Sequence, residues 1–173
     1  MKKIGFLLFF VLLGLGVSAQ KFAGLDKSPM DLTMLRKDRN AKPIAKIFYS
    51  RPQLAGRKLA DLAPDGKVWR LGANEATELI INEPIKVGGT KLAAGSYTMY
   101  AVPSASKWTI VISKDTDVWG AYSYNESNDI LRVDAPTMKA KETIDAFSID
   151  FNYGDKAIYF GWGDVIAKLP IEL

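Results

Sequence analysis

The chain has 173 residues, with 23 basic and 19 acidic side chains, and it contains neither cysteine nor histidine. The absence of thiol and imidazole groups excludes disulfides, a Ser-His-Asp triad, a cysteine nucleophile and ordinary zinc, copper or haem sites. The basic residues are scattered and form no long run, which argues against a nucleic-acid partner.

The first segment of the chain has the pattern of a secretory signal. Two lysines precede an apolar run from Ile4 to Val17, and small residues that fit a cleavage site follow. A retained membrane anchor is the weaker interpretation, because the run is shorter than the ~20 residues that cross a bilayer and no basic stop follows it. We expect residues 1–19 to be removed, leaving a periplasmic or secreted protein without a membrane span, in which residues 20–173 form one domain.

Residues 30–40 leave two interpretations open. Ser28 and Pro29 could begin a helix, whereas Leu32 and Met34 could alternate along a strand. The alternation favours the strand.

The rest of the chain is typical of short β-strands separated by turns. A helical turn is predicted at residues 58–62 and a short hairpin at residues 83–95. Residues 152–155 supply the turn of a second hairpin, because they include Asn, Gly and Asp. The predicted strands, in chain order, cover residues 44–49, 77–82, 97–102, 108–113, 130–133, 147–151, 158–162 and 165–173.

This succession of strands and turns predicts an all-β fold. We expect a single-domain antiparallel β-sandwich, jelly-roll-like, with at most one or two short helices. Since no disulfide can support it, the stability of this fold has to come from its hydrophobic core.

Arg51 is the first candidate ligand-binding residue. It follows a predicted strand and precedes Pro52, which cannot donate a backbone hydrogen bond and so directs the chain into a loop. An arginine at the end of a strand can present its planar guanidinium to a carboxylate or phosphate. The alternative is an internal salt bridge, with Glu75 or Glu78 as partner, since structural ion pairs imitate functional ones.

Residues 66–77, with the sequence GKVWRLGANEAT, crowd polar side chains into a segment that leads into a strand. Trp69 is either a core aromatic, which is the commoner role, or a stacking surface for a ligand. Arg70 could join the salt bridge or the ligand site. Asn74 and Glu75 could hydrogen-bond the backbone of their own loop, or they could face a cleft.

A third group of candidates lies between Trp119 and Tyr124. Its aromatic content resembles the flat stacking surfaces of sugar-binding proteins. If Trp119 and Tyr122 are exposed, they offer aromatic faces to a ligand. Ordinary packing beneath a loop is the alternative.

Catalysis and metal binding have weaker signals. A glycosidase requires a second carboxylate facing Glu75, and Glu78, Asp129 and Asp134 qualify by residue type only. Asp115-Thr116-Asp117 lacks the glycine and the distal glutamate of a calcium loop, so we interpret these as solvated loop acids. We expect no metal and no cofactor, and the sequence leaves open whether the chain is an enzyme.

Several motifs together resemble a known family. They are Tyr49-Ser50-Arg51-Pro52, residues 66–77, residues 94–97 (AGSY), Trp119-Gly120-Ala121-Tyr122 and residues 129–133 (DILRV). In these motifs the chain resembles the secreted bacterial family called domain of unknown function 2911, over nearly the whole mature length. The resemblance implies a β-sandwich-like domain exported to the periplasm or beyond, and it implies no mechanism. Leu71 departs from the family pattern, in which a small polar residue is common at that position.

These observations predict a non-catalytic binding module for a small polar or carbohydrate-like ligand or for a protein partner. The alternatives are a glycosidase-like hydrolase that uses Glu75 as acid or base, and a structural module of the cell envelope. The predicted ligand-binding residues are Arg51, Trp69, Arg70, Asn74, Glu75, Trp119 and Tyr122.

Overall fold

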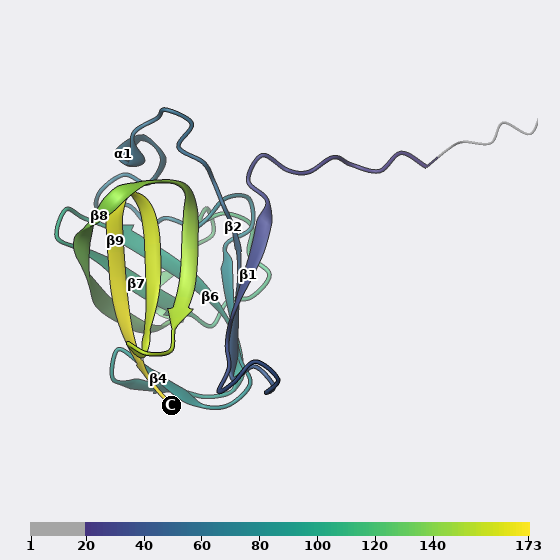
Figure 1. Ribbon diagram of the computed structural model, residues 1–173, viewed down its shortest axis with the longest axis vertical. Coiled ribbons are helices and arrows are strands. Elements are labelled where there is room, and N and C mark those ends of the chain that lie inside the picture. The colour runs from purple at the N-terminus through teal and green to yellow at the C-terminus, as the bar shows by residue number, and fades with distance from the viewer. Residues whose placement is uncertain (1–19) are drawn as a thin grey trace, which may run out of the picture.

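A computed structural model describes residues 20–173, so the predicted signal segment, residues 1–19, lies outside the described residues. Its elements are β1 (Met30–Leu35), β2 (Ala45–Ser50), α1 (Leu59–Leu62), β3 (Thr77–Ile81), β4 (Ile85–Val87), β5 (Thr90–Leu92), β6 (Gly95–Pro103), β7 (Lys107–Ser113), η1 (Glu126–Asn128), β8 (Asp129–Asn152) and β9 (Ala157–Glu172). The all-β prediction is confirmed, because these strands form one antiparallel sheet in the order β1-β2-β3-β6-β7-β8-β9-β4-β5 (Figure 1).

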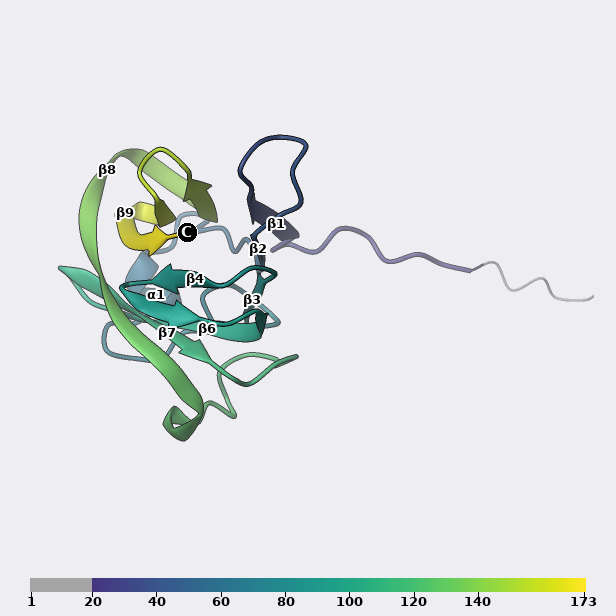
Figure 2. The same ribbon diagram turned by 90° about the horizontal axis from the view of Figure 1, so that it is seen from below.

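The sheet curls over itself into a sandwich-like body. β8 is 24 residues long and pairs first with β7 and then with β9, so it carries the chain from one layer into the other. Figure 2 shows β8 curving from the layer of β6 and β7 to the layer of β9. The edge of the sheet formed by β1 and β2 lies against β8. There the Tyr49 hydroxyl of β2 donates to the Ile149 carbonyl at 3.1 Å.

The core lies between the two layers and contains a cluster of four aromatic side chains. Trp69, Trp108, Phe147 and Trp162 come from a loop, β7, β8 and β9, and all four are buried. The Trp69 ring stacks on that of Trp162 with centroids 5.2 Å apart, and it meets those of Phe147 and Trp108 edge-on at 4.9 and 5.7 Å. Burial of these rings supplies stability that disulfides cannot supply in this chain.

β1 confirms the strand interpretation of residues 30–40, although its apolar side chains face outward. Leu32 and Met34 are both more than a third exposed. Asp31 and Thr33 face inward instead, because both find polar partners on neighbouring segments there.

The sequence predicts the two longest strands only in pieces. The predicted strands at residues 130–133 and 147–151 are the two ends of β8, and those at 158–162 and 165–173 both belong to β9. The middle of β8 is mostly exposed, and register shifts interrupt its pairing with β9. Such irregularities break the period-two pattern from which strands are predicted.

Candidate functional site

The segment between α1 and β3 extends the edge of β6. Trp69 N–H donates to the Ala101 carbonyl at 2.8 Å, and Ala101 N–H donates back to the Trp69 carbonyl at 2.9 Å. After Arg70 the chain leaves this edge as a first loop, residues 71–76. It returns at Thr77, whose N–H donates to the Arg70 carbonyl at 3.1 Å.

A second loop, residues 117–122, lies against the first and pairs with its backbone. Gly120 N–H donates to the Asn74 carbonyl at 2.9 Å, and Glu75 lies opposite Trp119 in an antiparallel bridge. Asn74 adopts a left-handed conformation, with φ of 59°, which allows the first loop to turn sharply. The fold thus brings together three of the residues that the sequence singles out, from positions more than 40 apart.

Trp119 and Tyr122 of the second loop form an exposed aromatic platform. Their rings stack, with centroids 5.6 Å apart and planes within 16° of parallel. The two side chains are 61% and 81% exposed, whereas the other three tryptophans are at most 5% exposed. Neither Trp119 nor Tyr122 is therefore packed beneath a loop.

A hollow borders the platform on the side of Tyr122, and we call it the arginine hollow. Its volume is about 220 Å³, and Arg70 is the one charged residue that lines it. The lining residues are Leu62, Pro64, Val68, Trp69, Arg70, Ala121 and Tyr122. A guanidinium in such a setting attracts anionic and hydroxylated groups.

A larger hollow, which we call the acidic hollow, is lined by Asp117 and Val118 at the start of the second loop. Its volume is about 390 Å³. Three carboxylates line it, those of Glu75, Glu78 and Asp117, and no basic residue does. The remaining lining residues are Met30, Phe48, Ala76, Ile80, Thr98 and Val118. The two ends of the second loop therefore line two hollows of opposite charge.

Arg70 and Tyr100 are neighbours with unusual surroundings. Because Trp69 pairs with Ala101 in antiparallel register, we infer that the adjacent residues Arg70 and Tyr100 lie opposite each other on the side of the sheet away from the core. Arg70 Nε and the Tyr100 hydroxyl are both buried without a hydrogen-bond partner. Most buried polar groups in proteins have hydrogen-bond partners, so the presence of two unpartnered groups on these neighbouring residues requires an explanation.

Tyr124 covers Tyr100 and fixes the chain that follows the second loop. The two rings meet edge-on with centroids 5.1 Å apart. The Tyr124 hydroxyl donates to Asp129 at 2.6 Å, and Arg132 forms an ion pair with the same carboxylate at 2.8 Å. Burial, and then the hydrogen bond to Asp129, raise the pKa of Tyr124 to about 12. Burial also raises the pKa of Tyr100, with a contribution from the charges of Asp115 and Asp129.

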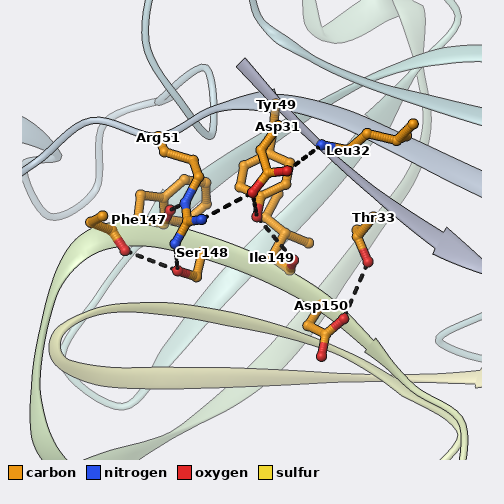
Figure 3. A network of polar contacts seen from close by, with 10 residues as sticks. Asp31, Leu32, Thr33, Tyr49, Arg51, Phe147, Ser148, Ile149 and Asp150 are labelled. Atoms are coloured by element: carbon orange, nitrogen blue, oxygen red, sulfur yellow. Dashed lines mark hydrogen bonds and ion pairs between the residues drawn. The ribbon is translucent and has the colours of Figure 1, made fainter. Parts of the chain in front are cut away.

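All three nitrogen atoms of the Arg51 guanidinium bond to other groups of the protein. Nη1 forms an ion pair with Asp31 at 3.0 Å, Nε donates to the Phe147 carbonyl at 3.0 Å, and Nη2 donates to the Ser148 hydroxyl at 2.8 Å (Figure 3). The partner carboxylate is thus on β1, and it is neither of the two glutamates considered from the sequence. This network ties the end of β2 to β1 and β8.

Trp69 also has a structural role. Its indole Nε1 donates to the Gly72 carbonyl at 3.0 Å, which fixes the start of the first loop, and its ring lies in the core. Gly72 in turn lies close to Ser50, since a Cβ at position 72 would stand 3.1 Å from the Ser50 carbonyl oxygen. The two motifs around positions 51 and 75 therefore meet through backbone packing at Gly72.

The remaining candidate carboxylates lie in different surroundings. Asp134 pairs with Lys107 at 2.6 Å and accepts from Thr109 at 2.8 Å, which together lower its pKa. Asp129 is held by Tyr124 and Arg132, as described above. Neither of these two lines the hollow that contains Glu75.

Tyr100 is not among the candidates predicted from the sequence, and Asp117 is predicted only as a solvated loop acid. Residues 97–102 are predicted as a strand from their aromatic and β-branched content, which does not distinguish the two faces of that strand. Strict alternation along the strand would have identified the position of Tyr100. Met99 and Ala101 face the core, so Tyr100 between them faces the opposite side of the sheet. The position of Asp117 beside Glu75 depends on how the two loops pair, which no local pattern shows.

Metal binding and membrane spanning are two further properties that bear on function. Within residues 20–173, no group of three or more acidic side chains is arranged to hold a metal ion. No helix in the same part of the chain is both long enough and apolar enough to cross a membrane.

Comparison with known proteins identifies the family. The family model described as "Protein of unknown function (DUF2911)" matches residues 29–171. The chain belongs to the DUF2911 family. This match confirms the resemblance seen in the sequence motifs, and it covers all nine strands except the last residue of β9. No curated protein and no solved structure matches this DUF2911 chain.

Proposed function

We propose that this DUF2911 protein is an exported, non-catalytic module that binds a saccharide or a similar small polar ligand on the aromatic platform. The observation that carries the proposal is the exposed stacking of Trp119 and Tyr122 on a loop whose two ends line hollows of opposite charge. Exposed aromatic patches rimmed by polar residues commonly mark binding sites.

The chemistry of a sugar fits this arrangement. A sugar ring has apolar C–H faces that can stack on aromatic rings, and hydroxyl groups at its edge that need hydrogen-bond partners. Trp119 and Tyr122 are both mostly exposed, so their rings are accessible to such a contact. Glu75 in the acidic hollow can accept hydrogen bonds, and Arg70 in the arginine hollow can donate them.

Export is the second part of the proposal. It is supported by the signal pattern of residues 1–19 and by the family resemblance. Expression of the full chain in a bacterial host, followed by fractionation and N-terminal sequencing, tests it. We expect a periplasmic or extracellular product that begins at Gln20, whereas a cytoplasmic product that retains Met1 would contradict export.

Binding is tested by titrating the purified protein with a panel of soluble saccharides in a calorimeter. We expect at least one saccharide class to bind, and Trp119→Ala or Tyr122→Ala to weaken that binding by about tenfold or more. The matched control is Tyr153→Ala, which removes an exposed tyrosine from the turn between β8 and β9. Unchanged binding in both platform variants would contradict the proposal.

A hydrolase that uses Glu75 is the second candidate, because the acidic hollow gathers Glu75, Glu78 and Asp117. Glycosidases need two carboxylates on either side of the bond that they cleave. A panel of glycoside substrates should then show turnover that is lost in Glu75→Gln and retained in Glu83→Gln, an exposed glutamate that lines neither hollow. Absence of turnover across the panel would eliminate this candidate.

A further inference from the structure

We infer that the ligand of this site carries an oxyanion, either a carboxylate or a phosphate, and that Arg70 is the residue that binds it. The inference rests on the proposed function and names the class of saccharide, an acidic one.

Arg70 differs from the other arginines around the core. Arg51 pairs with Asp31, and Arg132 pairs with Asp129. Arg57 donates to the backbone carbonyls of its own turn. Within residues 20–173, no ion pair or hydrogen bond engages the guanidinium of Arg70, and its Nε is buried without an acceptor.

An unpartnered guanidinium is costly inside a protein and useful in a binding site. Burying a donor without an acceptor lowers stability, so a residue of this kind is expected where it serves another role. The fork of an arginine matches the two oxygens of a carboxylate or phosphate, and it binds them through parallel charge-assisted hydrogen bonds.

The charges around Arg70 leave its own charge uncompensated. The arginine hollow has no acidic lining residue. Asp129, whose charge reaches Tyr100, is paired with Arg132 at 2.8 Å through Oδ2, while its Oδ1 is buried without a hydrogen-bond partner. Tyr100, which the Trp69–Ala101 bridge places opposite Arg70 in register, also has a buried hydroxyl without a hydrogen-bond partner.

The dimensions of the site limit the part of the ligand that enters. The arginine hollow, at about 220 Å³, is smaller than the roughly 300 Å³ at which pockets for drug-sized ligands begin. It therefore suits one charged sugar unit beside the Tyr122 ring, with the rest of an oligosaccharide lying across the platform.

Matched pairs of ligands test the inference on the unaltered protein. One arm compares short oligogalacturonides with their methyl esters of equal length, and the other compares glucose 6-phosphate with glucose. Calorimetry should show that the charged member of at least one pair binds roughly 10- to 100-fold more tightly than the neutral member. The arm that shows the preference identifies the source of the oxyanion.

Variants then assign the preference to Arg70. Arg70→Gln should remove the difference between charged and neutral ligands, and Arg70→Lys should restore part of it, because lysine keeps the charge and loses the fork. Arg39→Gln, which makes the same change at an exposed position between β1 and β2, should bind as the unaltered protein does.

The outcomes separate this inference from the proposed function. Equal binding of charged and neutral members in both arms, with binding still lost in Trp119→Ala, would overturn the acidic-ligand inference alone. Absence of binding by every saccharide would overturn both.

Discussion

Gly120 lies directly against the ring of Tyr122, so that a Cβ atom at position 120 would stand 2.6 Å from two carbon atoms of that ring. Gly120 also has a φ of +73°, in the left-handed region that favours glycine. The orientation of the platform therefore depends on a residue that has no side chain.

The first prediction concerns this contact. Gly120→Ala should lower the free energy of unfolding by about 1–2 kcal/mol for the backbone conformation alone, and it should also displace the Tyr122 ring and weaken ligand binding. Urea unfolding and calorimetric titration measure the two effects. Gly89→Ala is the matched control, because Gly89 has a φ of +84° and open space around its Cβ position. Equal effects of the two changes on binding would show that the ring contact is unimportant.

The second prediction is that Arg51 acts in stability and not in binding. Arg51→Ala should destabilise the fold by about 1–3 kcal/mol, because it leaves the inward-facing Asp31 and two acceptors on β8 without their donor. Asp31→Ala, alone and combined with Arg51→Ala, completes a double-mutant cycle in urea, and the two changes should not add. A stable Arg51→Ala protein that no longer binds saccharide would assign Arg51 to the ligand site instead.

The third prediction contrasts two tryptophans. Trp69→Ala should cost about 3–5 kcal/mol, enough to unfold a marginally stable domain, because Trp69 contacts three other core aromatics. Trp119→Ala should change stability by no more than about 0.5 kcal/mol, since its side chain is mostly exposed. Thermal unfolding followed by circular dichroism compares them. A large loss in Trp119→Ala would mean that the platform is structural.

The fourth prediction concerns alkaline pH. The pKa of Tyr124 is raised from 10.0 to about 12, so the folded state holds the phenol proton more tightly than the unfolded state does. The stability from this group is fully present below pH 10 and is lost as the pH rises from 10 through 12. Tyr124→Phe should therefore reduce the fall in stability over that range, as measured by urea unfolding at pH 9, 10 and 11. An identical slope in the variant would contradict the raised pKa of Tyr124, which burial and then the hydrogen bond to Asp129 produce.

Local sequence patterns predict most of the fold. The alternation of apolar residues locates most of the strands, and the turn residues at 152–155 locate the last hairpin. The continuity of β8 is not predictable in this way, because its exposed middle has no apolar face and its register shifts. The orientation of β1 is not predictable from the local pattern either. Leu32 and Met34 face outward because Asp31 and Thr33 find their polar partners on the inner side of the strand.

The candidate site residues can be selected from the sequence only where they are close together along the chain. Arg70 and Glu75, just before and within the first loop, and Trp119 and Tyr122 on the second loop, are recognisable from residue type. Which carboxylate pairs with Arg51 depends on strand order, because Asp31 is opposite Tyr49 in the β1–β2 register and only the folded sheet places it beside Arg51.

The most direct test of the platform is acrylamide quenching of tryptophan fluorescence with and without a saturating saccharide. Three of the four tryptophans are buried, so quenching reports almost entirely on Trp119. A ligand that stacks on the platform should shift the emission to shorter wavelength and reduce the quenching constant severalfold, and Trp119→Phe should abolish both changes. If a saccharide binds in the calorimeter and leaves the quenching of Trp119 unchanged, the ligand site lies elsewhere and the account is wrong.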